Sequence, residues 1–492
     1  MGGHIFEQVR DNHVKSIMNG KRHFTYELQK IHMFKINGNV YVWSSAKKEA
    51  CEMSILTIKV IEMLQKGSKS FESIYDEMYE VISVSDLEIL LNELEEVGII
   101  ERNNYNCKPI SSFNLILTTK CNLNCLYCYG GNGKISDMSG GSYGMEQLDM
   151  QPEIGYQVVD YLLKTASMNK HGEIGGISFF GGEPLVNKST MKSILEYSEK
   201  QAKLFGVDIP KFSITTNGTL IDDEFISMCK YYRMSVQLSF DGLKTTQDRL
   251  RIYKNGNASS YDTCVKAFEL FNKNKIAIRI RATITKSNIN LMEVIENLEA
   301  LNVKQVHFAP ASISGMEDIG LNENDFERII SEYNKISDYM LKRIADGKEF
   351  VNCTNITGAL SQIHRKSNKT FCCGAGIGLV SVAPDGQLFI CHRFTGDHLH
   401  SIGSINEGIL FQKRYEFIKK LHMDSHTACA DCWCKDLCGG ECPYSNYMET
   451  GCLNTPASNH CKLHKGITEI AIHFASELRK NHIDHYWKYV SE

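Results

Sequence analysis

Three cysteines in the spacing CxxxCxxC are the residues of this chain with the clearest capacity for chemistry. Cys121, Cys125 and Cys128 directly follow the apolar run 113–118. Three thiolates from one tight loop can hold three irons of a [4Fe-4S] cube, whereas a closed cluster takes four cysteines. The next cysteine is Cys229, so one iron is left for a ligand that is not protein. The spacing alone leaves open a zinc knuckle or three unrelated thiols.

A second concentration of cysteines lies near the end of the sequence. Cys373 and Cys391 flank Gly386 in the pattern C-x12-G-x4-C. A pattern C-x2-C-x5-C-x3-C and one later cysteine follow, formed by Cys429, Cys432, Cys438, Cys442 and Cys461. The CxxC pairs by themselves fit a zinc ribbon and an iron–sulfur site equally well.

Short polar motifs end several apolar runs between these two groups of cysteines. The motifs are GGEP after 176–180, TTNG after 212–215 and SFDG after 235–240, and an arginine follows at 251. A carboxylate can accept from an ammonium group, hydroxyls and an amide can bind a ribose, and an arginine can clamp a carboxylate. Together they describe a site for an amino-acid nucleoside beside an open iron, and the candidate residues are Gly181, Gly182, Glu183, Asn217, Ser239 and Arg251.

The elements that must position these groups alternate between strand and helix after Pro109. Amphipathic segments of helical length separate the strands, at 153–168, 188–204, 289–301 and 323–345. Six such units favour a right-handed parallel sheet, either open and doubly wound or a partial barrel, with its site at the carboxyl ends of the strands. The predicted strands are 113–118, 176–180, 212–215, 235–240, 277–284 and 305–309. The glycine-rich segment 130–144 is interpreted either as a mobile cover or as flexible filler.

A different pattern precedes this region. Residues 1–30 have no strong pattern and are interpreted as a weakly ordered lead-in with room for one helix. Two alternating runs around Asn37-Gly38 then predict a hairpin over 31–43. Three helices and a short strand are predicted next, at 50–65, 70–82, 86–97 and 99–102, which makes a winged-helix-like module. Its last helix is acidic and would repel nucleic-acid phosphates, whereas the edge of its hairpin could take an extended peptide as an added strand.

The bulk properties narrow the class of protein. A net charge of -4 over 492 residues gives no basic field for nucleic acid. No apolar run approaches the roughly 18–20 residues of a membrane helix, and the polar beginning is not a signal peptide. We therefore expect a cytoplasmic, reducing and preferably anaerobic location, with no nucleic-acid or membrane partner. In such a compartment the 18 cysteines are metal ligands or thiols rather than disulfides.

The CxxxCxxC loop with an aromatic residue before its last cysteine, followed by GGEP, TTNG and SFDG, resembles the radical S-adenosylmethionine (SAM) superfamily. The resemblance covers about 113–310. It implies a partial (β/α)6 barrel in which Cys121, Cys125 and Cys128 hold a [4Fe-4S] cluster whose open iron is chelated by SAM. It further implies cleavage of SAM to a 5′-deoxyadenosyl radical and an electron donor such as flavodoxin or ferredoxin. The SAM pocket would include Tyr127, Gly181, Gly182, Glu183 on the amino group, Asn217, Ser239, and Arg251 on the carboxylate.

The C-terminal cysteines resemble those of the SPASM domain, which carries two auxiliary [4Fe-4S] clusters. The resemblance implies that Cys373, Cys391 and Cys442 ligate the nearer cluster, although Cys372 competes with Cys373. The farther cluster would take Cys429, Cys432, Cys438 and Cys461. Residues 374–379 lack the further cysteine that closes the nearer cluster in relatives, so that cluster is expected to have an open iron too. Cys434 and Cys452 fit neither set, and ordinary buried thiols are expected at Cys51, Cys107, Cys229, Cys264 and Cys353.

The N-terminal module resembles the PqqD-like domains that grip leader peptides of ribosomally made natural products, with a domain that only packs on the core as the alternative. The expected organisation is therefore a lead-in, a winged-helix-like recognition domain, a radical SAM partial barrel, and a SPASM domain with a C-terminal helix, at 1–30, 31–108, 109–345 and 346–492.

The function that follows is modification of a ribosomally made precursor peptide, with a cysteine-derived thioether crosslink as the leading product. This resembles thioether-forming maturases of the sactipeptide and ranthipeptide type. Alternatives are a carbon–carbon crosslink, an epimerisation, or the oxidation of Cys or Ser performed by anaerobic sulfatase maturases. In that last family an Asp commonly follows the position of Cys391, where this chain has His392. A non-catalytic iron–sulfur electron carrier is the distant alternative. The motifs of a SAM pocket argue against it, because a carrier needs no such pocket.

Overall fold

The computed structural model describes residues 25–67, 69–103, 109–131, 145–168, 174–256, 258–312 and 319–490. Its chain divides into two compact units. Unit 1 comprises Met1–Lys108 with Leu410–Glu416, and unit 2 comprises Pro109–Ile409 with Phe417–Glu492. The lead-in before residue 25, and all of the glycine-rich segment after 131, lie outside the described residues.

Unit 1 contains the predicted hairpin. Strands β2 (Ile31–Ile36) and β3 (Asn39–Ser44) pair antiparallel. Asn37 and Gly38 at the turn have φ of 51° and 89°, the left-handed values that a two-residue turn of this kind requires. A third strand, β4 (Glu49–Glu52), pairs with the other side of β3, so β2 and β4 are the edges of this sheet.

The helices of unit 1 pack on a second small sheet. Helices α2 (Ile55–Gln65), α3 (Phe71–Met78) and α4 (Val84–Glu96) enclose a core that includes Leu87, Leu91 and Leu94. The sheet has the order β5-β1-β6, from Lys69–Ser70, Thr25–Leu28 and Ile100–Asn103.

Two expectations for unit 1 were wrong in their boundaries. The first helix begins at Ile55, capped by Ser54, rather than near residue 50, because 49–52 hydrogen-bond to β3 as a strand. Residues 25–28, assigned to the lead-in, form a strand that pairs with β6. In both cases a distant pairing partner decides the conformation of a short and weakly patterned segment.

Unit 2 is built on one long mixed sheet, in the order β15-β14-β13-β11-β10-β9-β7-β16-β17-β18-β19. All six predicted strands are present and parallel to their neighbours. They are β7 (Ser112–Thr118), β9 (Gly176–Gly181), β10 (Lys211–Thr216), β11 (Ser235–Ser239), β13 (Ile278–Ile284) and β14 (Gln305–Pro310).

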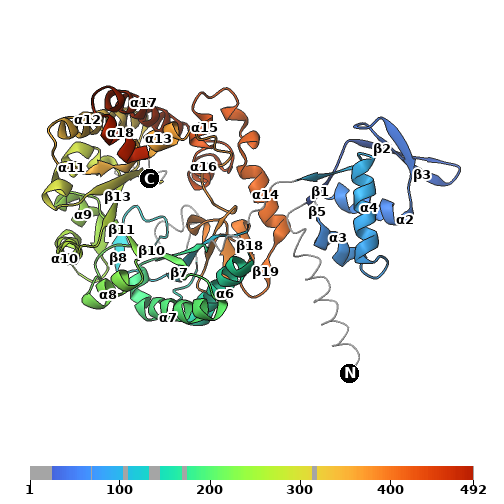
Figure 1. The fold of residues 1–492 in the computed structure, drawn as a ribbon, viewed down its shortest axis with the longest axis horizontal. Coiled ribbons are helices and arrows are strands. Elements are labelled where there is room, and N and C mark those ends of the chain that lie inside the picture. Colours follow the sequence, from blue (N-terminus) through green and yellow to red (C-terminus); the bar gives the residue numbers. More distant parts are fainter. Residues whose placement is uncertain are drawn as a thin grey trace. The chain divides into compact units, whose positions relative to one another are not determined.

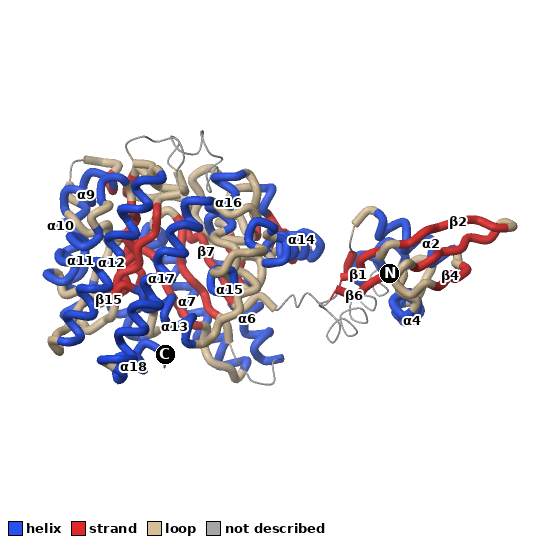
Figure 2. Tube along the Cα trace, turned by 90° about the horizontal axis from the view of Figure 1, so that it is seen from above, coloured by secondary structure: helices blue, strands red, loops and turns tan. Residues whose placement is uncertain are grey.

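Helices follow these strands and cover the outer side of the curved sheet (Figure 1), and Figure 2 shows the strands enclosed by helices. With the helices on that side and with β7 and β14 not paired to each other, the six strands form a partial barrel rather than a doubly wound sheet. The helices are α6 (Pro152–Met168), α7 (Lys188–Phe205), α8 (Asp223–Tyr231), α9 (Lys244–Leu250), α10 (Ser260–Lys273), α11 (Leu291–Ala300) and α12 (Glu323–Ala345).

The later part of the chain extends both edges of the barrel. β15 (Asn352–Cys353) pairs with β14, and β16 (Leu379–Val382) pairs in parallel with β7. An antiparallel run of β17 (Gln387–Phe389), β18 (Ser401–Ser404) and β19 (Gly408–Ile409) follows. Among the described residues no helix has the length and apolar character to cross a membrane. The remaining helices are α13 (Thr354–His364), α14 (Phe411–Leu421), α15 (Lys435–Cys438), α16 (Pro443–Thr450), α17 (Ser458–Asn481) and α18 (Ile483–Val490).

Candidate functional site

The CxxxCxxC loop leaves the carboxyl end of β7, as predicted, and is held by a strand from elsewhere in the chain. Its short strand β8 (Leu123–Cys125) pairs antiparallel with β12 (Arg251–Tyr253), which sets Cys125 opposite Arg251. The Leu126 amide also donates to the Leu250 carbonyl at 2.9 Å. The loop is thus tied to the segment that carries the predicted carboxylate clamp.

The three cysteines of this loop are partly buried. Burial raises the pKa of Cys121 to about 12, and raises those of Cys125 and Cys128 as well. Thiolates in such a place need a cation, which the irons of a cluster supply. Within the described part of the chain, these three sulfurs do not form a set in which all atoms lie within 4.8 Å of one another. A tetrahedral zinc site would need sulfurs about 3.8 Å apart at its Zn–S length, so the donor set fits an iron–sulfur cube better than zinc.

The two glycines of GGEP allow the motif to lie against the cysteine loop. A Cβ on Gly181 would lie 2.4 Å from the Thr118 carbonyl oxygen, and one on Gly182 would lie 2.2 Å from that of Lys120. The amides of Gly182 and Glu183 donate to these same two oxygens, each at 2.9 Å. The sequence predicted that a ligand approaches the glycines closely, but in the structure the backbone before Cys121 takes that space.

Glu183 is fully buried and links two strand ends to the cysteine loop. Its carboxylate accepts from the Leu185 amide at 3.1 Å, the Thr216 hydroxyl at 2.8 Å and the Asn217 amide at 2.7 Å. Burial raises the pKa of Glu183 to about 7, although these three donors favour the ionised form. The Asn217 side chain continues the chain of contacts by donating to the Cys121 sulfur at 3.8 Å.

Arg251 is clamped to a carboxylate of the protein itself. Its Nε and Nη2 donate to the two oxygens of Asp241 at 3.0 and 2.9 Å, with Asp241 fully buried and Arg251 6% exposed. The Tyr127 hydroxyl and the Thr283 amide also donate to Asp241. The Arg251 guanidinium lies 5.3 Å from the centre of the Tyr127 ring. A guanidinium has five donors, so the contact to a SAM carboxylate stays a prediction that the remaining three could serve.

Asp241 is a buried residue of this site that was not selected from the sequence. It was quoted within SFDG, yet only Ser239 was selected there. A carboxylate ten residues before an arginine was the available signal. Ser239 itself lies half-buried at the end of β11, in register with Arg281 of β13. The structure therefore gathers the candidate residues at the carboxyl ends of β7, β9, β10 and β11, and Asp241 joins Arg251 and Tyr127 beside them.

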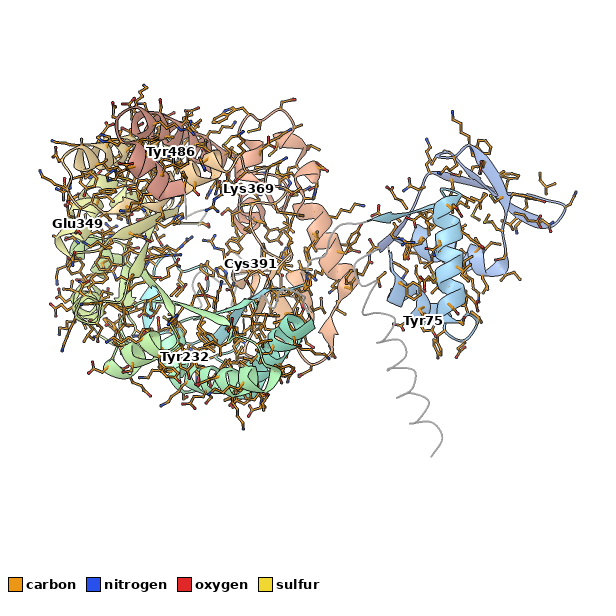
Figure 3. All side chains as sticks on the ribbon, in the orientation of Figure 1. Tyr75, Tyr232, Glu349, Lys369, Cys391 and Tyr486 are labelled. Carbon is orange, nitrogen blue, oxygen red and sulfur yellow. The ribbon has the colours of Figure 1, made fainter. Side chains whose placement is uncertain are left out.

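The first set of C-terminal cysteines comes together around Cys391. Burial, together with the neighbouring sulfurs of Cys442 and Cys373, raises the pKa of Cys391 to about 12. Cys372 donates a hydrogen bond to Cys373, which lowers the pKa of Cys373 and raises that of Cys372. Figure 3 shows Cys391 on the inner side of the ring of elements in unit 2, whereas Tyr232 lies on its outer side.

The second set is brought together around Cys461. Its pKa is raised to about 11, first by burial and then by Glu441, Cys429 and Cys432. Cys438 is next to Glu441, and these two with His464 have ligand atoms within 4.8 Å of one another. Glu441 was not selected from the sequence, because an acidic residue inside C-x3-C has no signal of its own.

Aromatic and cationic side chains lie between the two cysteine regions. Tyr129, the residue after Cys128, has its ring 5.9 Å from that of His392 and 6.2 Å from that of Tyr444. The guanidinium of Arg393 lies 5.3 Å from the centre of the Tyr129 ring and 5.2 Å from that of Tyr444. The CxxxCxxC loop and the residues beside Cys391 and Cys442 thus face a shared interior.

The cysteines without an assigned role follow the expectation in part. Cys229, Cys264 and Cys353 are buried thiols as predicted, but Cys51 is only half-buried because it lies on the edge strand β4. Cys107 lies outside the described residues. Cys434 is buried against Thr468, and Cys452 is exposed.

Comparisons with known proteins agree with this geometry. The chain is 25% identical over 437 residues to the radical SAM cyclopropyl synthase TigE of Paramaledivibacter caminithermalis, which covers 82% of this chain and 87% of that protein. It is 24% identical over 357 residues to a cysteine-type anaerobic sulfatase-maturating enzyme of Clostridium novyi, covering 68% and 86%. The solved structure of native anSMEcpe with bound AdoMet shares the fold, with a TM-score of 0.61 at 20% identity over 75% of this chain and 99% of that one.

The radical SAM superfamily is a family of enzymes that bind a [4Fe-4S] cluster and SAM, and the cysteine loop fits that cluster by its donors and their spacing. Residues 115–332 match the sequence profile of that superfamily. With the three sulfurs at the end of β7 and the polar strand ends beside them, this part of the chain belongs to the radical SAM superfamily.

Proposed function

We propose that this protein modifies a ribosomally made precursor peptide and that its product is a cysteine-derived thioether. The cluster and SAM, when bound, supply a radical that removes a hydrogen atom from the substrate. The observation that carries the proposal is the packing of Tyr129, next to Cys128, against His392 and Arg393, which follow Cys391, because it brings the two groups of cysteines to the same part of unit 2.

We assign the roles of the SAM-site residues from the resemblance to the radical SAM superfamily. Cys121, Cys125 and Cys128 hold the cluster, and the β8–β12 pairing fixes the loop that presents them. Glu183 receives the amino group of SAM, and Arg251 keeps donors for its carboxylate while Asp241 fixes its guanidinium plane.

The proposal of a thioether product is supported by the cysteines near Cys391. Cys373, Cys391 and Cys442 give an auxiliary cluster three ligands, and 374–379 form a tight turn in which the Leu379 amide donates to the Gly374 carbonyl at 2.9 Å. That turn contains no cysteine to complete the set. An open iron there would bind a substrate thiolate within reach of a carbon radical. Cys429, Cys432, Cys438 and Cys461 hold the second auxiliary cluster.

The peptide partner is proposed from unit 1. Its β2 edge has the geometry for β-strand addition, in which main-chain hydrogen bonds bind an extended peptide. Among the relatives, the antilisterial bacteriocin subtilosin biosynthesis protein AlbA of Bacillus subtilis is 23% identical over 340 residues, covering 67% of this chain and 64% of that protein. Its name concerns the making of a bacteriocin, which supports a peptide substrate for this chain.

A carbon–carbon bond is the second candidate product. It is favoured by the likeness to the cyclopropyl synthase, which extends over 82% of this chain. Oxidation of the sulfatase-maturase kind is less well supported at the residue after Cys391. His392 packs its ring 4.4 Å from that of Phe180, and burial lowers its pKa to about 3, so a neutral imidazole stands where a carboxylate is common in that family.

Release of 5′-deoxyadenosine tests the enzyme class. Anaerobically reconstituted full-length protein with SAM and dithionite should release it, and the triple variant Cys121→Ala/Cys125→Ala/Cys128→Ala should not. The iron signal of the auxiliary clusters should persist in that variant, which is the control for folding. Wild-type protein loaded with iron that releases no 5′-deoxyadenosine would exclude an enzyme of this class in favour of an electron carrier.

Product mass and thiol count then distinguish the two crosslinks. A thioether makes the precursor peptide lighter by two hydrogens and removes one thiol that iodoacetamide can alkylate. The same mass loss with every thiol still alkylated would reject the thioether and support carbon–carbon bond formation.

A further inference from the structure

The inner face of the barrel below the candidate site carries positive charge. Along β13, Ile280 and Ala282 are buried toward the outer helices, so the alternating residues Arg279 and Arg281 face inward. His307 has the corresponding position on the neighbouring strand β14, with its Nδ1 at 3.1 Å from the Thr354 hydroxyl.

A cavity of about 470 Å³ lies against this face. Arg279, Arg281, His307 and Arg365 are among its lining residues, and no aspartate or glutamate is present among those that the structure describes. A second cavity of about 420 Å³ shares Arg279 with it and is likewise lined, in its described part, without a carboxylate. The cavity is thus roomy, polar and cationic. Arg279 and Arg365 are exposed, whereas Arg281 is partly buried. Buried charges are ordinarily paired.

Arg281 is the cation most in need of a partner. In the described part of the chain no residue forms a hydrogen bond or an ion pair with its guanidinium. Burial and the nearby charge of Arg393 both lower its pKa, and its own charge contributes to the low pKa of His307, which is about 4 mainly because of burial. His307 is therefore neutral near pH 7 and adds no second positive charge beside Arg281.

The position of Arg281 connects this charge to the reaction site. Its Cα is in register with Ser239, and its carbonyl accepts from the Phe240 amide at 3.2 Å. Thr283, two residues further along β13, donates its amide to Asp241 beside the CxxxCxxC loop. Two residues of a strand span about 7 Å, so Arg281 lies one layer beneath that site. The charges of Tyr129 and Cys442 also act on it, so it belongs to the shared interior.

We propose that Arg281 binds the carboxylate of an aspartate or glutamate side chain in the substrate peptide, within the barrel cavity. This inference rests on the proposed function and adds to it the chemistry of the segment that is held beneath the radical. A carboxylate forms two parallel hydrogen bonds with a guanidinium, which would fix the position of the peptide backbone relative to the cluster loop. Two other anions are in reach: the Cys442 thiolate, whose charge acts on Arg281, and the SAM carboxylate, which is assigned to the layer of Arg251 above.

The experiment selects peptides without requiring turnover. Immobilised full-length holoenzyme with SAM is incubated with a random octapeptide display library, and the recovered sequences are compared between wild type, Arg281→Gln and Arg281→Lys. The exposed Arg249 of α9 lines neither cavity, so Arg249→Gln is the matched control. Any selection made by unit 1 is common to all four proteins and cancels in the comparison. SAM binding to each protein is measured by equilibrium dialysis.

Loss of one charge-assisted contact should lower affinity for acidic peptides about tenfold or more. Wild type and Arg249→Gln should enrich Asp and Glu relative to Arg281→Gln, Arg281→Lys should recover part of the enrichment, and SAM affinity should not change. Equal acidic content in the peptides recovered by wild type and Arg281→Gln would overturn the proposal. A loss of SAM binding in Arg281→Gln with unchanged peptide selection would overturn it as well and would assign Arg281 to the SAM carboxylate. The experiment measures peptide binding and not turnover. A protein that releases no 5′-deoxyadenosine would therefore contradict the proposed function but would not decide whether Arg281 binds acidic peptides.

Discussion

Replacing Asp241 by Asn tests whether the buried ion pair organises the SAM-cluster loop. Arg251 and Asp241 are 6% and 0% exposed, and two hydrogen bonds of 3.0 and 2.9 Å join them. At about 4 Å between charge centres and an effective dielectric constant of about 20, their attraction is about 4 kcal/mol. Asp241→Asn leaves the arginine charge buried and uncompensated, so unit 2 should lose about 3–5 kcal/mol of its free energy of unfolding.

A double-mutant cycle measures the coupling between the two side chains. The variants Asp241→Asn, Arg251→Met and the double variant are unfolded with urea in a Trp43→Phe background, so that the tryptophans at 433 and 487 report on unit 2 alone. The double variant should be more stable than the sum of the two losses predicts, by about 3 kcal/mol or more. A coupling free energy below about 1 kcal/mol, the range of exposed ion pairs, would refute the reasoning.

Two further predictions concern the GGEP motif. Gly182→Ala places a Cβ 2.2 Å from the Lys120 carbonyl oxygen, so it should lower both thermal stability and the iron bound at the CxxxCxxC loop, whereas Gly358→Ala, with nothing within 4 Å, should leave both unchanged. Equal iron content in the two variants would contradict the close packing. The pKa of Glu183 is about 7 in the folded protein against an ordinary 4.5, so the folded state holds an extra proton between these values and stability falls as pH rises across them. The fall should be at most about 3 kcal/mol and should flatten in Glu183→Gln, and a wild-type unfolding midpoint that does not change between pH 5 and 8 would contradict the raised pKa.

The sequence was sufficient for the parts of the fold that are set by local pattern. The six barrel strands are apolar runs bounded by polar turns, and Asn37-Gly38 can form only a few turn types, so both predictions were confirmed. Strands β1 and β4 were missed because their conformation depends on pairing with β6 and β3. The sequence pattern of a short segment does not show which distant strand it pairs with.

The candidate site was predictable in composition but not in its internal contacts. Cysteine spacing and the strand-end motifs named the residues that meet there, since carboxyl ends of parallel strands share one edge. The pairing of Arg251 with Asp241 was missed because Arg251 was considered only as a partner of the SAM carboxylate and not as a partner of a protein carboxylate. The close fit of Gly182 to the Lys120 backbone was missed for a similar reason. A glycine in the sequence indicates a flexible backbone, but it does not show which neighbouring atoms exclude a larger side chain.

The short ladder between β8 and β12 has a consequence for the nascent chain. Cys125 pairs with Arg251, and the strand before the cysteine loop is flanked by β16 at Leu379–Val382. The cysteines are therefore synthesised long before the segments that hold them, by roughly 10–50 s at ribosomal rates of about 5–20 residues per second. Iron loading must wait for the last of these segments, so chains truncated before Leu379 should leave the ribosome with three reactive thiols and no stable cluster site.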